Sequence, residues 1–365
     1  MSSQIDNKIS LGQFFTPDSI CQYMVSLFQL NTFSEIRLLD PGAGTGNLSC
    51  AFMEFLSQQK NLPSSVYANC YEIDSEIVPQ LKNNLFFAEK LLDGLSVHFE
   101  SNIIEGDFIE TTVHSLSDHL GLFKNGLMRY THCIINPPYK KISSNSYHAY
   151  LLREIGLETP NYYSAFVAIA VLLLESGGEI VAILPRSFCN GVYFTRFRKF
   201  FLENMSLRHI HVFESRKNIF DNNVLQENII LHAVKRKDTP MPVTLSFSRD
   251  ASFQEYAEQK VAFSEVIHPD DKACYIHIPV RKTDAVISQK IKTFRQTLDD
   301  LGISVCTGPV VDFRLVDFIT TKGECPLIYP RHFENGRIKW PKYHHKKTDR
   351  IFYHSETKKW LMANQ

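Results

Sequence analysis

Several signals are missing from this sequence of 365 residues. It has eight cysteines, but no two of them form a CxxC pair or another metal-ligand spacing, which argues against a zinc site. It has no run of 18 apolar residues and no N-terminal signal sequence, so we expect neither export nor a membrane span. We therefore expect reduced, buried thiols in a cytoplasmic protein. Low-complexity segments and internal repeats are also absent.

Charge is balanced over the whole chain, with 39 basic and 39 acidic residues, so the net charge indicates no partner. The distribution is uneven. Residues 1–110 contain 5 basic and 14 acidic residues, whereas residues 331–365 contain 9 basic and 3 acidic ones. This asymmetry predicts an acidic catalytic half and a basic end that faces a polyanion. For the C-terminal segment taken alone, a solvated charged face is the alternative.

The length and the apolar content of 44% allow two or three domains with sizeable cores. We expect a first α/β domain over residues 1–250 and a polar, irregular connection over 250–275. A smaller α+β module over 276–365 follows, with short strands near 305–309 and 327–330. Its first helix is predicted from apolar residues at helical spacing, namely Val286, Ile287, Ile291, Phe294 and Leu298.

The most informative stretch is residues 38–48, where an apolar run ends at Asp40 and glycines precede an amphipathic segment. The glycines, at alternate positions, are Gly42, Gly44 and Gly46. This order predicts a strand, a tight loop and a helix N-terminus, because glycine permits the turn and lets a ligand approach the backbone. The motif alone fits a cofactor loop or a plain turn equally well. A second motif, at residues 136–139, favours the cofactor.

Polar side chains end four successive apolar runs, which we predict to be parallel strands. They are Asp40, Glu72, Asp107 and Asn136. Since the carboxyl ends of such strands form the ligand crevice of open α/β sheets, we predict a doubly wound, Rossmann-like sheet that binds a nucleoside cofactor there. Glu72 follows Asp40 by 32 residues, and Asn47 stands where dinucleotide-binding proteins have a third glycine. Those proteins place the acid about 20 residues on, so both differences argue against NAD.

The remaining pattern predicts a helix over 162–175 and then the strands 179–185, 209–214, 227–234 and 243–247, with a hairpin around 235–240. A basic helix lies around Arg196, Arg198 and Lys199. Near the N-terminus, Thr16 and Pro17 predict a helix with Thr16 as its N-cap. Phe14 and Phe15 before them either pack beneath this helix or cover a planar or sulfonium-bearing ligand.

Asn136-Pro137-Pro138-Tyr139 follows the fourth predicted strand. The Asn136 amide oxygen and the Pro137 carbonyl are two acceptors that can converge on an exocyclic NH₂ and build up the lone pair of its nitrogen. The prolines stiffen the loop, and Tyr139 can stack on a planar base or amide. No metal is required for this chemistry. A rigid turn explains the prolines but not the asparagine and tyrosine beside them.

Together these segments resemble the gamma-class N6-adenine DNA methyltransferases, and most closely the modification enzymes of the PstI/BsuBI type. The segments that carry the resemblance are Gly12–Pro17, Asp40–Gly46, Tyr71–Asp74, Gly106–Phe108 and Asn136–Tyr139. Their order, with the Phe-Thr-Pro segment first and a recognition module last, is typical of that class. The resemblance covers about residues 11–234 and, more weakly, 302–341.

The resemblance implies S-adenosylmethionine (SAM) as cofactor and double-stranded DNA as partner, with the target adenine flipped out of the duplex. The implied cofactor contacts are Phe15 and Thr16 to the methionine part, the loop with Asp40, Gly42, Gly44 and Gly46 around the cofactor, Glu72 to the ribose hydroxyls, Ile73 against the adenine and Asp107 to its amino group. The implied catalytic residues are Asn136, Pro137, Pro138 and Tyr139. Tyr139 would stack on the flipped base, and Phe220, with Phe213 as the alternative, would pack on its other side.

The recognition region of this subfamily usually continues well past the equivalent of Trp360, so we expect a shortened module here. Weak DNA binding, or dependence on a partner subunit, would follow. Basic groups at 196–199, 216–217 and 331–359 would contact phosphates.

The expected function is the adenine modification component of a type II restriction-modification system. Two alternatives stay open from the sequence. One is a protein-glutamine or RNA methyltransferase with the same Asn-Pro-Pro-Tyr site, and the other is a DNA-binding remnant without turnover.

Overall fold

The computed structural model describes residues 16–30, 33–120, 128–214, 227–236 and 241–279, and further residues 286–287, 290–291, 293–305, 308, 310–342 and 347–361. The chain divides into two compact units, Met1–Val286 and Ile287–Gln365. Each unit is described by itself. Phe15 and Phe220, for which the sequence predicts site roles, lie outside the described residues.

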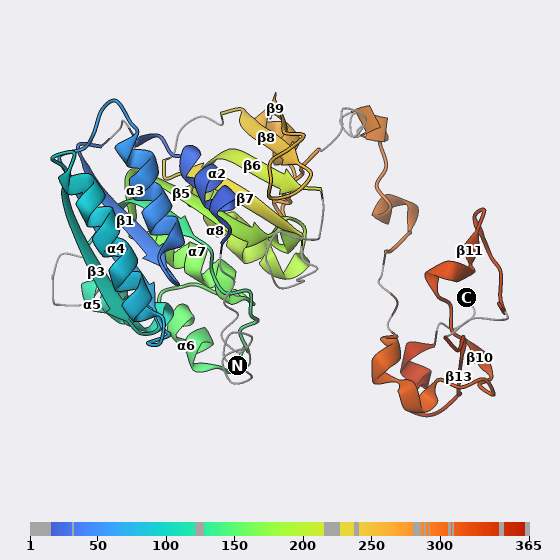
Figure 1. The fold of residues 1–365 in the computed structure, drawn as a ribbon. Helices are drawn as coiled ribbons and strands as arrows, with labels where there is room; N and C mark the ends of the chain where they lie inside the picture. Colours follow the sequence, from blue (N-terminus) through green and yellow to red (C-terminus); the bar gives the residue numbers. More distant parts are fainter. Residues whose placement is uncertain are drawn as a thin grey trace. The chain divides into compact units, whose positions relative to one another are not determined.

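A nine-stranded sheet forms the centre of the first unit, in the order β3-β2-β1-β4-β5-β7-β6-β8-β9 (Figure 1). The strands are β1 (Glu35–Pro41), β2 (Ser65–Glu72), β3 (His98–Glu105), β4 (Tyr130–Ile135), β5 (Leu174–Pro185), β6 (Ser206–Phe213), β7 (Asn228–Val234), β8 (Val243–Ser248) and β9 (Ala257–Val261). Strands β1 to β5 form a parallel block, in which every adjacent pair of strands is parallel. Strand β7 runs antiparallel to both β5 and β6. The predicted doubly wound, Rossmann-like sheet is confirmed.

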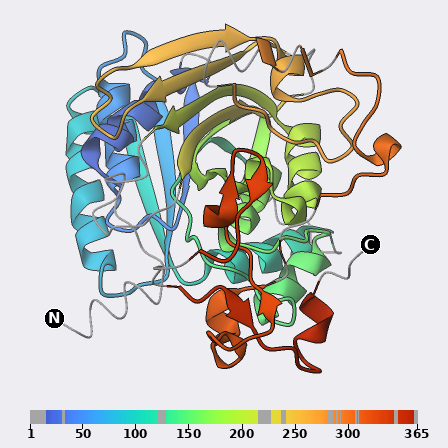
Figure 2. The ribbon, with the colours of Figure 1, turned by 90° about the vertical axis from the view of Figure 1, so that its right-hand side faces the viewer.

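Helices cover both faces of this sheet. They are α2 (Asp18–Ser26), α3 (Asn47–Ser57), α4 (Val78–Asp93), α5 (Phe108–Leu120), α6 (Tyr147–Glu154), α7 (Tyr162–Leu173), α8 (Thr195–Asn204) and α9 (Phe263–Val266). Figure 2 shows the blue and cyan helices α3 and α4 on one side of the strands and green helices on the other. Met24 and Phe52 belong to one buried apolar cluster, and Val167 and Phe201 belong to another. Within the described residues, no helix combines the length and apolar character needed to cross a bilayer.

Two local features of the first unit differ from the sequence predictions. β8 pairs in parallel with β6, which lies between β7 and β8. The hairpin predicted around residues 235–240 is therefore wrong, because a tight turn joins only neighbouring antiparallel strands. The N-cap of α2 is Pro17 rather than Thr16. The first unit also includes β9 and α9, which come after residue 250, where we predicted the first domain to end.

The second unit contains only short elements, with β10 (Cys325–Pro326) paired to β13 (Arg350–Ile351) and β11 (Phe333–Glu334) to β12 (Arg337–Ile338). The strand predicted near 327–330 is thus displaced to β10, and a 3₁₀ turn, η7 (Pro330–His332), follows it. The apolar residues of the predicted helix do not form a core, since each is 50% or more exposed. They are Val286, Ile287, Ile291, Phe294 and Leu298.

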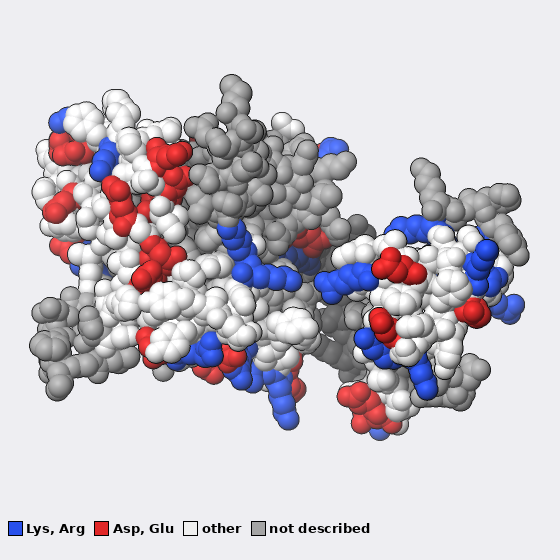
Figure 3. Space-filling model, turned by 90° about the horizontal axis from the view of Figure 1, so that it is seen from below, with Lys and Arg blue, Asp and Glu red and all other residues white. Residues whose placement is uncertain are grey.

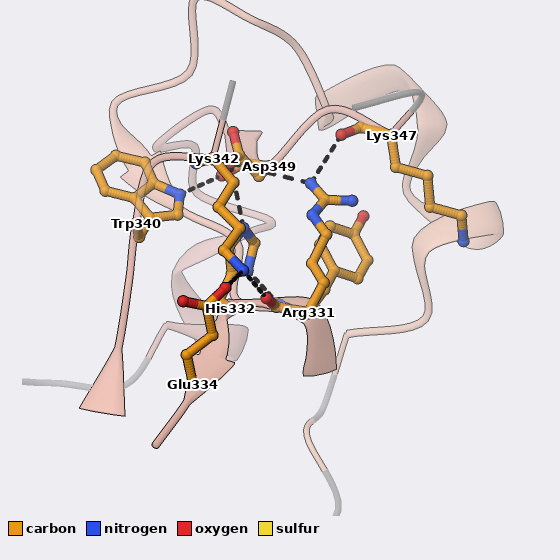
Figure 4. Close-up of polar contacts among 8 residues, drawn as sticks. Arg331, His332, Glu334, Trp340, Lys342, Lys347 and Asp349 are labelled. Atoms are coloured by element: carbon orange, nitrogen blue, oxygen red, sulfur yellow. Dashed lines mark hydrogen bonds and ion pairs between the residues drawn. The ribbon is translucent and has the colours of Figure 1, made fainter. Parts of the chain in front are cut away.

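Asp349 is the polar centre of the second unit (Figure 4). Its carboxylate lies 3.2 Å from Nε2 of His332, which is fully buried, and its carbonyl accepts a hydrogen bond of 3.0 Å from the Trp340 indole. Lys342, beside it, pairs with Glu334. These contacts hold together a unit that has little apolar core.

His132 on β4 supplies a stability prediction. Its imidazole is fully buried, with the rings of Phe28, Phe33 and Phe52 at 5.3–5.5 Å, and Nε2 has no hydrogen-bond partner among the described residues. Burial lowers the pKa of His132 to about 4. The unfolded chain takes up this proton near pH 6.5, whereas the folded protein takes it up only near pH 4. The contribution of His132 to the free energy of unfolding is therefore fully present above pH 6.5 and is lost as the pH falls toward 4.

His132→Phe should therefore be more stable than the wild type by a margin that grows from pH 6.5 to 4, by about 1 kcal/mol per pH unit. Urea denaturation across this range measures the margin. A difference between the two proteins that does not change with pH would contradict the assignment.

Candidate active site

The parallel strands bring the four predicted polar residues to one edge of the sheet. Asp40 lies near the end of β1 and Glu72 ends β2, while Asp107 follows β3 and Asn136 follows β4. These strands are neighbours in the order β3-β2-β1-β4, and the carboxyl edge of such a sheet forms its ligand crevice.

The glycine loop turns sharply over the end of β2. The backbone N–H groups of Gly42 and Ala43 both donate to the Tyr71 carbonyl, at 2.9 and 2.8 Å. The three glycines have left-handed φ angles, namely 79° at Gly42, 58° at Gly44 and 83° at Gly46. Gly46 is also the N-cap of α3. The loop conformation thus depends on residues without a Cβ, as the sequence pattern indicates.

Gly46→Ala should destabilise the fold and distort this loop. An added Cβ would lie 2.6 Å from Cδ1 of Leu81, and the φ of 83° adds backbone strain. We expect a loss of about 1–3 kcal/mol in the free energy of unfolding. Gly156→Ala is the matched control, because Gly156 has a similar φ of 74° but open space around its Cβ position. Urea denaturation of both variants gives the comparison, and an equal loss in both would show that packing on Leu81 is unimportant.

Glu72 connects the glycine loop to the end of β2. One carboxylate oxygen accepts from the Gly44 N–H and the other from the Asp74 N–H, both at 2.8 Å. The side chain is 4% exposed, and burial raises the pKa of Glu72 despite these bonds. Ile73, the next residue, is 53% exposed at the same edge. An acidic acceptor and an apolar surface therefore lie side by side.

Asp40 is almost fully buried and only half satisfied. Its Oδ2 accepts a hydrogen bond of 2.6 Å from the Ser49 hydroxyl, but its Oδ1 has no partner among the described residues. Burial, with a further contribution from the negative charge of Glu72, raises the pKa of Asp40 to about 7. A buried carboxylate with an orphaned oxygen favours a donor or a positive charge beside it.

The raised pKa of Asp40 makes a second stability prediction. Between the unfolded value of about 3.9 and the folded value of about 7, the folded protein holds a proton that the unfolded chain has lost. The contribution of Asp40 to stability therefore falls as the pH rises through this window. We expect urea denaturation of the two cofactor-free proteins to show that the free energy of unfolding of the wild type falls relative to that of Asp40→Asn between pH 4 and 7. Above pH 7 the difference should stay constant. A constant difference across this range is the result that would refute it.

The Asn136 side chain joins the second motif to the N-terminal one. Its Nδ2 donates to the Thr16 hydroxyl at 3.0 Å, which fixes the orientation of the amide and turns Oδ1 away from Thr16. Asn136 is half-buried, whereas Thr16 and Pro137 are buried. The hydroxyl that we predicted to cap α2 is instead used at this site.

Tyr139 is anchored on the interior side of the loop. Its hydroxyl donates to the Ile183 carbonyl of β5 at 3.2 Å, and its ring meets Tyr163 edge-on at 6.3 Å. It packs against both apolar clusters, and burial raises its pKa well above the usual value. Pro138, before it, is half-buried. The tyrosine therefore has one fixed position relative to Asn136.

One cavity is lined by all three motifs. Its lining residues are Thr16, Gly42, Ala43, Gly44, Thr45, Asn47, Leu48 and Asn136. Thr16 and Asn136 are 120 residues apart in the sequence. Glu72, Ile73, Asp107 and Tyr139 do not line this cavity, although they lie on the same strand ends.

A polar chain at Asp107 was not predicted from the sequence. One carboxylate oxygen of Asp107 lies 3.0 Å from Nε2 of His148, whose Nδ1 lies 2.9 Å from the Tyr162 hydroxyl. The other oxygen accepts from the Glu110 N–H at 2.9 Å. Burial would raise the pKa of Asp107, but the His148 bond and the backbone bonds outweigh it and lower that pKa, while the pKa of His148 is raised. His148 and Tyr162 carry no local motif, so only the fold identifies them.

Charge is unevenly distributed on the surface. On the face shown in Figure 3, acidic side chains gather at the end of the first unit that carries α4 and β3. In the second unit basic and acidic side chains are mixed, because Lys339 and Lys342 pair with Glu334, and Lys347 lies 2.6 Å from Asp312. Such pairing places a negative charge beside each of these three lysines, so they do not form a purely basic patch.

Comparison with known proteins identifies the family. A family profile described as Eco57I restriction-modification methylase matches residues 43–220. The type II methyltransferase M.BsuBI of Bacillus subtilis is 40% identical over 99% of this chain and 71% of its own length. The type II methyltransferase M.PstI of Providencia stuartii is 37% identical over 97% and 69%, respectively. This chain belongs to the type II restriction-modification methyltransferase family.

Membership in this family confirms the resemblance read from the sequence motifs and supports a DNA methyltransferase. It argues against the protein-glutamine and RNA alternatives. Solved structures agree on the fold. A modification subunit assigned to a type I restriction enzyme of Vibrio vulnificus YJ016 matches with a TM-score of 0.54 at 13% identity, over 79% of this chain and 64% of that one. The type IIG restriction endonuclease BpuSI matches with a TM-score of 0.51 at 17% identity, over 77% and 34%.

Proposed function

We propose that this member of the family transfers a methyl group from SAM to the N6 amino group of adenine in double-stranded DNA. It would act in the cytoplasm as the modification component of a type II restriction-modification system. The observation that supports this best is the cavity between the glycine loop, Thr16 and Asn136. It combines a loop suited to a nucleoside cofactor with the Asn136 amide, whose oxygen is an acceptor suited to an exocyclic amine.

The residues at this edge fit SAM. An orphaned, buried oxygen of Asp40 favours a positively charged neighbour, and SAM carries an ammonium and a sulfonium group. Glu72 offers acceptors for ribose hydroxyls, and the exposed Ile73 offers an apolar surface for adenine. The further cofactor contacts that we propose are Phe15 and Thr16 to the methionine part, the backbone of Gly42, Gly44 and Gly46 around the cofactor, and Asp107 to the adenine amino group.

When bound, SAM supplies a methyl group activated by the sulfonium. The chain's own contribution is to make the weakly nucleophilic amine reactive. The Asn136 amide oxygen and the Pro137 carbonyl accept hydrogen bonds from the two N–H groups of the amine. These bonds orient the nitrogen lone pair toward the methyl group. The Thr16 hydroxyl fixes the amide, and Pro138 keeps the loop rigid. As the new N–C bond formed, the methyl–sulfur bond would break, S-adenosylhomocysteine would leave, and the nitrogen would release one proton to solvent.

The target adenine must leave the base stack to reach this loop. We propose that Tyr139 stacks on one face of the flipped base and Phe220 on the other. The second unit, with residues 276–286 before it, is proposed as the target-recognition module. A partner subunit would add further DNA contacts if this module binds DNA weakly by itself.

Transfer of labelled methyl from SAM to three substrates in parallel, namely mixed plasmid DNA, total RNA and a protein extract, tests this function. Label in DNA alone, competed away by S-adenosylhomocysteine, is the expected result. Label in RNA or protein instead would overturn the substrate. Absence of any transfer despite measured cofactor binding would favour the inactive remnant or dependence on a partner subunit.

A further inference from the structure

The connection between β5 and α8 exposes an aromatic tip. Tyr193 is 83% exposed and Val192 is 64% exposed, whereas Phe188 and Phe194 on either side are buried. The tip is part of a 3₁₀ turn, η3 (Val192–Phe194). Burial of the flanking phenylalanines fixes the ends of the connection in the apolar core. A large ring exposed on such an anchored segment offers an apolar surface that a partner can cover.

Arg198 of α8 makes this connection rigid. The residue is fully buried, although we predicted from the sequence that it contacts phosphates, so that prediction is wrong. Its guanidinium donates to the carbonyls of Phe188 and Gly191, at 2.9 and 2.7 Å, and to that of Ala273, at 2.9 Å. The Cζ atom of the guanidinium lies over the Tyr275 ring, 4.7 Å from the ring centroid. Burial of a cation costs free energy unless its N–H donors are hydrogen-bonded. Here the guanidinium donors bind carbonyl groups of the segment before Tyr193 and of Ala273, which stabilises that segment.

The turn before the tip is tight as well. A Cβ on Gly191 would lie 2.8 Å from the Ser187 carbonyl and 2.9 Å from the Phe194 ring. The Gly191 N–H also donates to that Ser187 carbonyl, at 2.9 Å. The backbone that carries Tyr193 is therefore held in one conformation, which lowers the entropy that a binding event must overcome.

Two ring contacts connect this tip to the catalytic loop. The Tyr139 ring meets Tyr163 edge-on at 6.3 Å, and Tyr163 stacks on Phe194 at 5.5 Å with an interplanar angle of 29°. The Tyr163 hydroxyl is also 3.2 Å from that of Ser187. The residue next to Tyr193 is thus packed through one intervening ring onto the tyrosine of Asn-Pro-Pro-Tyr.

Tyr193 also lines an open cavity of about 550 Å³ with residues that follow the catalytic loop. Its lining includes Ile142 and Ser144, and Thr195 and Arg196 from the segment after the tyrosine. The lining combines apolar groups, hydroxyls and a guanidinium, which suits a nucleic acid strand, whose bases stack and whose phosphates accept. Arg196 pairs with Glu158, which also lines this cavity, so the net charge there is small.

Resting on the proposed function, we infer that Tyr193 enters the DNA duplex beside the target adenine and fills the space that the flipped base leaves. Flipping a base costs a few kcal/mol in lost stacking and pairing. An inserted ring recovers part of the stacking, as apolar wedges do in other DNA-bending proteins. The rigid support by Arg198 and Gly191 holds the ring in place against the base pairs it separates.

The experiment first maps the methylated adenine on plasmid DNA and then uses two synthetic duplexes with that site. In one the target adenine is paired with thymine, and in the other an abasic site replaces that thymine. Tyr193→Ala should methylate the paired duplex about tenfold more slowly than the wild type and the abasic duplex at nearly the wild-type rate, because an unpaired adenine leaves the stack easily. Tyr193→Phe should retain the wild-type rates, since its ring is intact.

Phe87→Ala is the matched control, because Phe87 is a similarly exposed aromatic, 62%, on α4. It should leave both rates unchanged. Wild-type rates for Tyr193→Ala on the paired duplex, or an equal loss on both duplexes, would overturn the wedge. If the wild type methylates neither duplex nor plasmid, the proposed function fails instead, so the two failures are distinct. Thermal denaturation confirms that the variants fold.

Discussion

Asn136→Ala should lower the methyl-transfer kcat by about 10²–10³-fold, which is the usual cost of removing one precisely placed group that stabilises developing charge. The amide oxygen is the side-chain acceptor that we assign to the adenine amine. Its loss leaves only the Pro137 carbonyl, so the lone pair of the amine stays delocalised in the ring. Steady-state kinetics with labelled SAM and plasmid DNA measure kcat, while the KM for SAM should change little.

Two further variants separate the amide's chemistry from its packing. Thr16→Val removes the same 3.0 Å hydrogen bond to Nδ2 but keeps the Asn136 oxygen. It should raise the KM for SAM and lower kcat less than tenfold. Asn136→Asp keeps an acceptor oxygen and should retain more activity than Asn136→Ala. If Thr16→Val reproduced the full loss of kcat, the role of Asn136 would be to hold Thr16 rather than to bind the amine.

Glu72→Ala should weaken cofactor binding by about 10²–10⁴-fold, since two charged hydrogen bonds to ribose hydroxyls contribute about 1.5–3 kcal/mol each. The loss also frees the N–H groups of Gly44 and Asp74, which Glu72 now holds at 2.8 Å. Calorimetric titration with S-adenosylhomocysteine measures the Kd, and kcat at saturating SAM should fall only a few-fold.

Glu72→Gln separates charge from geometry. Its amide keeps one acceptor oxygen, so its affinity should lie between those of the wild type and Glu72→Ala. An unchanged Kd in Glu72→Ala would show that Glu72 does not bind the cofactor. Its role would then be limited to stabilising the glycine loop.

The placement of the strand ends was predictable from the sequence. Strands β1 and β4 are mostly buried apolar runs followed or closed by a polar residue, and parallel strands must present their carboxyl ends at one edge. Only the last apolar residues of β3, Ile103 and Ile104, carry this pattern, because the rest of that strand is largely polar. Asp40 and Asn136 could thus be assigned to one crevice without any contact being known. The φ angles of Gly42 and Gly46 were likewise implied by the residue type.

Contacts between distant segments were not predictable. The sequence gives Arg198 the pattern of an exposed basic helix, and only the docking of residues near Ala273 buries it. His148 reaches Asp107 because α6 packs beside α5, a contact with no local signal. Thr16 has the sequence pattern of an N-cap, but the strand order brings Asn136 close enough to use its hydroxyl. In each case tertiary packing overrides a correct local propensity.

The central claim is that the site acts on the amino group of adenine, and the most direct measurement is the identity of the methylated nucleoside. Plasmid DNA incubated with the protein and SAM is digested to nucleosides and analysed by mass spectrometry. We predict N6-methyl-2′-deoxyadenosine as the sole new product, and none of it with Asn136→Ala. Methylated cytosine in its place, or methyladenine formed equally well by Asn136→Ala, would contradict the proposed chemistry.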